Sequence, residues 1–338
     1  MIFYLIGIDY KRLPPDIREN AYRNKDSIDR YWKSVSPGKA AILITCNRIE
    51  IYGFADSLEE AEYLQKRFRY LFPDTFKNAY LINGGKDIFE HGVKLACGLE
   101  SQLKGESQII RQLEEWMNKE NFPIFLVDIW TDIIETAKYI RVKSGLVESD
   151  INIANVVFND IKHRIKKKSV IDVTVIGTGK VAGIIAETRL PLIQLSFISG
   201  KNHTKAKRLA QLAGGKALLS KDIPKQLIDT DVVISATSSP HYALSISHFK
   251  GAIRVRKRLL YIYDLAVPCD VEPGVMDLNF NVLPNPGQII SDFILSNEYL
   301  KRSIKSATKL VMESISKYRR KYEDTNRCAT KQTCYYTS

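Results

Sequence analysis

A glycine-rich turn between a strand and a helix constrains the fold of this chain more than any other feature. A short run of β-branched residues, 173–176, ends at this turn. The turn reads Gly177, Thr178, Gly179, Lys180, Val181, Ala182 and Gly183. In such a setting the first glycine permits a tight bend and the second lets the backbone approach a pyrophosphate, while N–H groups at the helix start face the anion. The third glycine stands one place later than in the commonest fingerprint. We predict nucleotide binding; a purely structural turn is the alternative.

Strand-like and helix-like segments alternate around this turn. Apolar runs at 170–176, 195–199, 231–236 and 259–264 have the composition of strands, and segments such as 180–189 and 204–212 have helical spacing. Alternation of this kind implies a parallel sheet covered on both faces. We therefore predict a Rossmann-like α/β domain over residues 148–288.

The end of the second strand of this domain indicates which nucleotide binds. NAD sites usually place Asp or Glu there to bind the ribose hydroxyls. This chain instead has Ser199 and Lys201, with no acid nearby and with Lys205 and Lys207 following. Lysine attracts a 2′-phosphate, so NADPH is favoured over NADH; surface lysines at a helix start are the alternative. Thr237, in the loop after the 231–236 strand, is expected near the nicotinamide.

The regions on either side have different patterns. Residues 1–147 mix strands (2–8, 41–44, 50–54) with helices (58–71, 107–116), which predicts an α+β domain. Residues 289–323 contain no Gly or Pro and carry an apolar seam on a 3-4 spacing that Asn297 alone breaks. We predict one long helix within a third region, 289–338. Its seam should pack against another helix and could pair two copies into a homodimer.

Composition limits the classes of function. The net charge of +12 favours an acidic partner such as nucleic acid, although each basic cluster alone could be a solvated face. No apolar run approaches the ~20 residues of a membrane helix, and the apolar start has the features of a buried strand and lacks those of a signal peptide. We therefore expect a soluble, cytoplasmic protein with no membrane partner.

The cysteines and histidines do not predict a metal site. The five cysteines are scattered without a C-x-x-C pair, and no two of the five histidines stand at i, i+4. The scattered cysteines are Cys46, Cys97, Cys269, Cys328 and Cys334. We therefore expect neither a bound metal nor a disulfide framework.

Cys46 has an unusual polar setting. It ends an apolar run and is followed by Asn47, Arg48 and Glu50. A cysteine after apolar residues is most often a core residue. A neighbouring guanidinium, however, lowers a thiol pKa and favours the nucleophilic thiolate. Cys46 is therefore a candidate nucleophile.

Two blocks resemble a known family. Residues 45–52 read Thr-Cys-Asn-Arg-Ile-Glu-Ile-Tyr and resemble the signature of glutamyl-tRNA reductases. A second block agrees, with His91, then Ala-Cys-Gly-Leu-Glu-Ser at 96–101 and Gly-Glu-Ser-Gln-Ile at 105–109. The resemblance implies an α+β N-terminal catalytic domain, an NADPH-binding Rossmann-like domain and a long C-terminal helix.

The same resemblance implies a reaction. Cys46 would attack the ester between glutamate and tRNA(Glu), and NADPH would reduce the thioester to glutamate-1-semialdehyde, the first step of the C5 route to 5-aminolevulinate and tetrapyrroles. His91 would assist proton transfer, and Arg48 would hold the substrate carboxylate. The remaining substrate-binding positions implied are Thr45, Asn47, Ser101, Glu106 and Gln108. A glutamate-1-semialdehyde aminomutase is a partner that the family suggests.

Some features depart from the family pattern. Asp9-Tyr10 stands where Asn-His is usual, Cys97 replaces a serine, and Cys269 occupies a common arginine position. The chain also ends soon after Glu323, where the family usually continues into a helical dimerisation domain. Two alternatives stay open: a shikimate-dehydrogenase-like NADP dehydrogenase, and a non-catalytic paralogue that binds tRNA or a synthesis enzyme.

Overall fold

The chain forms two compact units. The computed structural model describes residues 2–13, 17, 20–21, 24–45, 47–72, 78–119, 121–147, 151–166, 170–188, 191–200, 202–239, 241–266, 269–278, 280–283 and 286–332. Unit 1 comprises residues 1–151 and 297–338, and unit 2 comprises residues 152–296. An α+β unit and a parallel-sheet, Rossmann-like unit confirm the predicted fold class.

Unit 1 is built on a four-stranded antiparallel sheet. Its strands, in the spatial order β2-β3-β1-β4, are β2 (Ala40–Ile44), β3 (Arg48–Ala55), β1 (Ile2–Asp9) and β4 (Tyr80–Asn83). The register pairs Asp9 at the end of β1 with Arg48 at the start of β3. This register places the end of β1 beside the start of β3.

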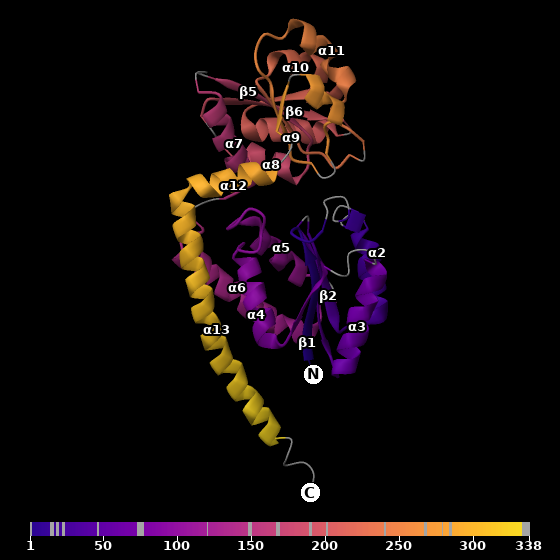
Figure 1. Ribbon diagram of the computed structural model, residues 1–338, viewed down its shortest axis with the longest axis vertical. Helices are drawn as coiled ribbons and strands as arrows, with labels where there is room; N and C mark the ends of the chain where they lie inside the picture. The colour runs from indigo at the N-terminus through magenta and orange to yellow at the C-terminus, as the bar shows by residue number, and fades with distance from the viewer. Residues whose placement is uncertain are drawn as a thin grey trace. The chain divides into compact units, whose positions relative to one another are not determined.

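Helices cover both faces of this sheet (Figure 1). On one side lie α2 (Lys25–Val35) and α3 (Leu58–Leu71); on the other lie α4 (Gly85–Ala96), α5 (Gln108–Met117) and α6 (Ile124–Lys143). Side chains on β3 alternate between the faces. Ile51 joins the apolar cluster of α2 and α3, whereas the ring of Tyr52 packs edge-on against Trp130 of α6, with ring centroids 4.8 Å apart. Arg48, Glu50 and Tyr52 therefore share the face that α4–α6 cover.

Unit 2 contains a six-stranded parallel sheet in the order β10-β9-β8-β5-β6-β7. The strands are β5 (Ile171–Ile176), β6 (Ile193–Ser199), β7 (Lys216–Leu219), β8 (Val232–Ser235), β9 (Tyr261–Asp264) and β10 (Asn281–Leu283). Taken in chain order this is the 3-2-1-4-5-6 arrangement of dinucleotide-binding folds, in which the direction of strand addition reverses between β5 and β8. Ligands in such sheets bind at the carboxyl ends of the strands beside that reversal.

Two groups of helices pack in unit 2. Helices α10 (Ile223–Asp229) and α11 (Ile246–Val255) pack together and share an apolar cluster with Ile198 of β6. A second group consists of α7 (Ile153–Arg164), α8 (Lys180–Glu187) and α9 (His203–Ala213), and α12 (Pro286–Ser296) packs against α7. The short 3-10 turns are η2 (Ser220–Asp222) and η3 (Pro273–Leu278).

The expectation of one helix from 289 to 323 is wrong. Helix α12 ends at Ser296, and a separate helix, α13, spans Glu298–Gln332. Between them the side-chain oxygen of Asn297 accepts the N–H of Leu300 at 3.0 Å. Asparagine caps helix N-termini well because its side chain replaces a missing backbone acceptor. The one position that broke the apolar spacing is therefore where a new helix begins.

The apolar seam of α13 is filled by its own unit. Leu300, Ala307 and Val311 are fully buried, and α13 packs against α4 and α6. Farther along, the rings of Phe89 on α4 and Tyr318 stack with centroids 4.0 Å apart. The predicted helix–helix packing is thus satisfied within one chain. Among the described residues, no helix is long and apolar enough to cross a membrane.

Replacing Asn297 by Ala should lower the free energy of unfolding of unit 1 by about 1 kcal/mol, because the first turn of α13 loses its acceptor. Urea unfolding followed by tryptophan fluorescence measures this, since all three tryptophans lie in unit 1. Asn297→Ser keeps a capping oxygen and should unfold like the parent chain. Equal losses in both variants would contradict the capping role.

Candidate functional site

A buried carboxylate lies at the centre of the polar cluster in unit 1. Glu50 is fully buried, and its Oε1 accepts a hydrogen bond from Arg48 Nη1 at 2.7 Å. His91 Nε2 lies 2.9 Å from the same oxygen, and the Tyr80 hydroxyl also donates to it. The Tyr52 hydroxyl donates to Oε2 at 2.6 Å. One carboxylate therefore holds the two predicted site residues Arg48 and His91 together.

The charges in this cluster stabilise one another. Burial alone would raise the pKa of Glu50, but Arg48 and His91 hold that pKa well below its usual range. Burial opposes the charge on Arg48, yet Glu50 outweighs it and the pKa of Arg48 lies above its usual value. Burial and the Glu50 charge raise the pKa values of Tyr52 and Tyr80. The pair is therefore ionised, and both phenols remain hydrogen-bond donors.

The β2–β3 turn brings the signature residues to the end of this strand pair. The N–H of Thr45 donates to the carbonyl of Arg48 at 2.9 Å, which closes the hairpin. Thr45 is buried, and its hydroxyl accepts the N–H of Asn47 at 3.2 Å. Cys46, the predicted nucleophile, lies outside the described residues. Its sequence neighbours on both sides are fixed next to the Arg48–Glu50 pair.

A glycine-rich loop between α4 and α5 completes the cluster. Arg48 Nη2 donates to the carbonyl of Glu100 at 2.6 Å. The predicted site residue Ser101 follows Glu100 directly in the chain. Gly98 has φ +77°, and a Cβ there would lie 2.9 Å from the Glu106 carbonyl oxygen. Only glycine therefore fits this close approach.

Arg141 of α6 also binds this loop through its backbone carbonyls. Its Nη1 donates to the carbonyls of Cys97 and Glu106, each at 3.0 Å, and its Nη2 donates to that of Gly105 at 3.3 Å. Burial lowers the pKa of Arg141.

Among the predicted substrate-binding residues, Ser101 is buried, and Gln108 is half-buried at the start of α5. Their substrate roles, like those of Thr45, Asn47 and Glu106, stay predictions.

In unit 2 the glycine turn lies at the carboxyl end of β5, at the reversal of strand order. Gly177 has φ +116°, and a Cβ on it would lie 2.4 Å from the carbonyl oxygen of Ala236, so glycine is required. A Cβ on Gly179 would meet nothing within 4 Å, which leaves open space at the start of α8. Helix α8 begins there with no side-chain cap, so its first N–H groups can bind an anion. These features fit a dinucleotide pyrophosphate.

The other predicted cofactor residues differ in placement. Thr178 and Lys180 flank Gly179, and Val181, Ala182 and Gly183 lie within α8; Ala182 is fully buried, and a Cβ on Gly183 would meet nothing within 4 Å. Ser199 ends β6, and its hydroxyl accepts the N–H of Asn202 at 2.9 Å. Lys201 lies outside the described residues. The roles of these residues remain predictions.

A buried aspartate fixes the loop after β8. Asp270 Oδ2 accepts the Ser235 hydroxyl at 2.7 Å and the N–H of Thr237 at 2.8 Å, and its Oδ1 accepts the Thr237 hydroxyl at 2.5 Å. Asp270 thereby sets the position of Ala236, against which Gly177 packs.

Asp270 and Glu50 were absent from the predicted site. The period of a strand puts Glu50 on the face of Arg48, but no local pattern pairs Asp270 with Thr237 across 33 residues.

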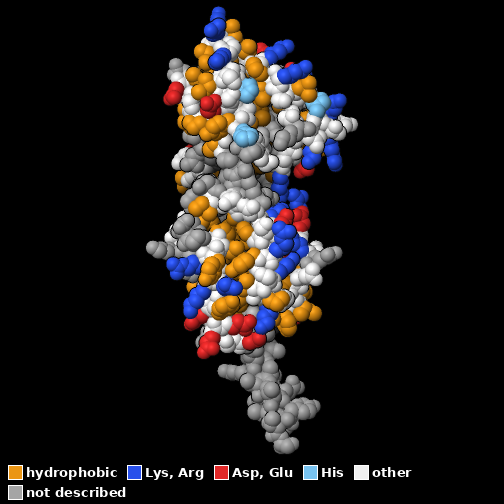
Figure 2. Space-filling view, turned by 90° about the vertical axis from the view of Figure 1, so that its right-hand side faces the viewer, with side chains coloured by type: hydrophobic (Ala, Val, Ile, Leu, Met, Phe, Trp, Pro, Cys, Tyr) orange, Lys and Arg blue, Asp and Glu red, His pale blue; other side chains and the backbone are white. Residues whose placement is uncertain are grey.

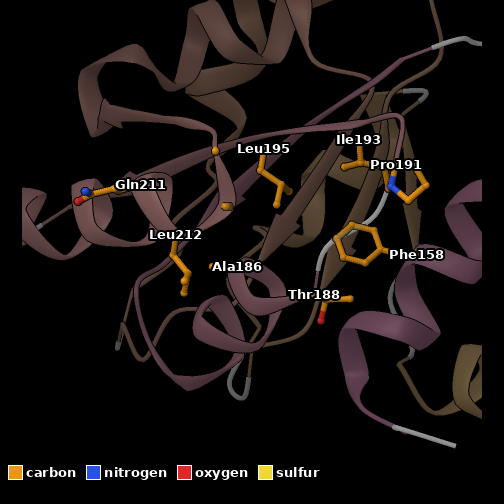
Figure 3. Close-up of a pocket in the computed structure, with 10 residues that line it drawn as sticks. Phe158, Ala186, Thr188, Pro191, Ile193, Leu195, Gln211 and Leu212 are labelled. Carbon is orange, nitrogen blue, oxygen red and sulfur yellow. The ribbon is translucent and has the colours of Figure 1, made fainter.

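One hollow in unit 2 lies away from the glycine turn. It measures about 530 Å³ and is lined by residues at the start of β6, such as Ile193 and Leu195 (Figure 3). The glycine turn lies instead at the carboxyl end of β5. Its lining, which includes Phe158, Pro191, Leu195 and Leu212, carries no titratable side chain. It therefore lacks groups for catalysis. Across the described ranges, no three His, Cys, Asp or Glu side chains cluster closely enough to hold a metal ion.

Basic charge is not confined to either site. Figure 2 shows Lys and Arg side chains spread over the visible face of both units, with Asp and Glu between them. The net charge of +12 therefore does not by itself locate a partner.

Comparison with known proteins shows which families the two units resemble. A family model described as glutamyl-tRNAGlu reductase, N-terminal domain, matches residues 6–143, the region that holds the Arg48–Glu50–His91 cluster. In this region the chain is similar to glutamyl-tRNA reductases. A second model, shikimate / quinate 5-dehydrogenase, matches residues 159–284, which form most of unit 2.

Individual glutamyl-tRNA reductases match along most of the chain. One from Marinobacter nauticus is 29% identical over 313 residues, covering 88% of this chain and 73% of the relative. One from Legionella pneumophila is 28% identical over 328 residues, covering 94% and 77%. The solved glutamyl-tRNA reductase from Methanopyrus kandleri is 23% identical, with a TM-score of 0.49 over 96% of this chain and 81% of that one.

Replacing Glu50 by Gln should destabilise unit 1 by about 3–5 kcal/mol at neutral pH, because Arg48 stays buried without its counter-charge. Since the folded-state pKa of Glu50 is depressed, its stabilisation is present above the unfolded value of about 4.3 and is lost as pH falls below that value. The difference between parent and variant, measured by denaturant unfolding, should therefore shrink between pH 7 and pH 3. Glu90→Gln on α4 removes a half-buried pair with Lys94 and is the matched control. A pH-independent difference would contradict this account.

If unit 2 binds the predicted NADPH, replacing Asp270 by Asn should weaken that binding about tenfold. An amide NH₂ cannot accept the donors at Ser235 and Thr237, so the loop that contacts Gly177 shifts. Fluorescence titration with NADPH measures the change. Asp277→Asn alters an exposed aspartate of η3 and should bind normally. Unchanged affinity in Asp270→Asn would show that this carboxylate does not set the cofactor cradle.

Proposed function

We propose that this chain reduces the glutamyl ester of tRNA(Glu) to glutamate-1-semialdehyde, the first step of the C5 route to 5-aminolevulinate and tetrapyrroles, with NADPH as reductant. The observation that carries the proposal is the buried Arg48–Glu50–His91 cluster at the end of the hairpin whose turn contains Cys46. The match of residues 6–143 to the N-terminal domain of glutamyl-tRNA reductases supports it, as does the similarity to curated glutamyl-tRNA reductases.

The chain's own residues suggest a division of labour in unit 1. Cys46 is the acyl acceptor: its thiolate attacks the ester carbonyl, and the tRNA leaves as an alcohol. Arg48 presents positive charge at the turn, which favours the thiolate and attracts the substrate carboxylate. His91, which is 11% exposed and held by Glu50, is placed to move a proton. Thr45, Asn47, Ser101, Glu106 and Gln108 are the proposed glutamyl-binding positions.

Unit 2 is proposed to bind the reductant. A nicotinamide dinucleotide supplies the hydride when bound. The open space at Gly179 and the uncapped start of α8 suit the pyrophosphate, and Thr237 lies in the loop proposed for the nicotinamide side. The choice of NADPH rests on the exposed Lys205 and Lys207 after β6, where an NAD site would have an acid.

A small-molecule dehydrogenase is the second candidate, because unit 2 matches the shikimate / quinate 5-dehydrogenase model. The match of residues 6–143 to the reductase domain argues against it, as does Cys46, which a direct hydride transfer would not need. A non-catalytic paralogue would have no use for a thiol, a buried Arg48 and a glycine turn together.

The partners and location form part of the same proposal. An aminomutase would take the unstable semialdehyde onward, and the reaction would take place in the cytoplasm. A homodimer would need a surface other than the α13 seam from Leu300 to Tyr318, because α4 and α6 already cover that seam.

Incubation with radiolabelled Glu-tRNA in the absence of NADPH should yield a covalent glutamyl adduct, and Cys46→Ala should abolish it. Cys46→Ser should lose NADPH-dependent turnover by at least about a thousandfold, since a hydroxyl at neutral pH is a far weaker nucleophile. Cys269→Ser removes an exposed thiol of unit 2 and should behave like the parent chain. Full turnover by Cys46→Ser would favour the small-molecule dehydrogenase.

A further inference from the structure

The loop after β1 lies beside the turn that contains the candidate nucleophile. Asp9, the last residue of β1, pairs with Arg48, the first residue of β3. Arg48 in turn closes the β2–β3 hairpin through its hydrogen bond with Thr45. Tyr10, Lys11 and Arg12 therefore leave the sheet at the same end as Thr45 and Asn47.

The proposed substrate has two halves that need separate contacts. One is the glutamyl group, for which the Arg48 side of the cluster supplies positive charge. The other is the 3′-terminal nucleotide, whose ribose oxygen is the leaving group and whose base and phosphate lie within one nucleotide of the attacked carbonyl. A single-stranded RNA end is bound by aromatic stacking and by cations that face its phosphates.

The β1 loop offers both kinds of group. Tyr10 is half-buried, and Lys11 Nζ lies 5.7 Å from the centre of its ring. Arg12 is 44% exposed, and its guanidinium lies 4.9 Å from the centre of the Tyr80 ring. Burial raises the pKa of Tyr10, Asp9 and Glu100 raise it further, and Arg48 lowers it. Tyr10 is therefore within electrostatic reach of the Arg48 cluster.

Asp9 holds this loop in one conformation. It is 4% exposed, and its Oδ1 accepts the N–H of Lys11 at 3.2 Å. Its Oδ2 accepts Arg12 Nη1 at 3.2 Å, and Leu13 N–H donates to its carbonyl at 3.0 Å. A fixed loop loses less conformational entropy when it binds a flexible end.

We infer that Tyr10, Lys11 and Arg12 form a clamp for the 3′-terminal nucleotide of the tRNA, in which Tyr10 stacks on the base and the two cations face the adjoining phosphates. This inference rests on the proposed function and adds to it the contacts for the leaving half of the substrate. A purely local role, in which Arg12 only neutralises Asp9, is the competing explanation.

Two acyl donors separate these roles. One is Glu-tRNA(Glu); the other is a small α-thioester of glutamate without a nucleotide. Formation of the glutamyl adduct is measured without NADPH for the parent chain, Tyr10→Leu, Lys11→Ala and Arg12→Gln. Lys33→Ala, which removes a 51% exposed cation paired with Asp29 on α2, is the matched control.

Each clamp variant should need about tenfold more Glu-tRNA for half-maximal acylation, whereas acylation by the small thioester should be unchanged. Lys11→Ala and Arg12→Gln should each flatten the dependence of log affinity on log salt by about 0.7, the value for one phosphate contact on a single strand. Tyr10→Phe retains a ring and should behave like the parent chain.

The outcomes are distinct. Normal use of Glu-tRNA by all the variants would overturn the clamp, and so would equal losses with both donors, which would indicate damage to Asp9 and Arg48. If the parent chain forms no adduct with either donor, the proposed function itself fails.

Discussion

The ion pair between Arg48 and Glu50 is the interaction on which the catalytic unit depends. Two opposite charges, both at most 1% exposed, would be costly if either lost its partner. The structure satisfies them with hydrogen bonds from β4, α4 and the loop after α4, through Tyr80, His91 and the Glu100 carbonyl. The pair thus joins segments that are distant in sequence, and the orientation of the hairpin turn follows from it.

This arrangement explains why chemistry and stability are inseparable in unit 1. Under the proposed function, the same guanidinium that stabilises the buried carboxylate would favour the thiolate of Cys46, two residues before it in sequence. The α4–α5 loop is held from the other side by Arg141, a second buried guanidinium that bonds to backbone carbonyls. Two buried guanidinium groups, those of Arg48 and Arg141, therefore hold the α4–α5 loop through hydrogen bonds to its backbone carbonyls.

In unit 2 a glycine and a buried carboxylate fix the loops at the carboxyl ends of β5 and β8. Gly177 allows the turn after β5 to touch the end of β8, and Asp270 holds the end of β8 in place. The cradle is thus made by backbone groups whose positions depend on a residue from beyond β9. Such a cradle can bind a pyrophosphate through backbone N–H groups. Lys180 is the one charged side chain in the turn.

The sequence by itself determined the class of each unit and most of the central strands. Its apolar periods place the central strands of both sheets, because burial imposes them, but they did not predict the short strands β4, β7 and β10. The glycine turn marks the nucleotide edge, because few other backbones can bend there. The spacing of Arg48 and Glu50 also puts them on one face of a strand. Only the tertiary structure decided that Glu50 bonds His91, that Asp270 bonds Thr237 and that α13 begins anew at Asn297 and covers α4 and α6. These depend on contacts across tens to hundreds of residues, and pairings at that range leave no period in the chain.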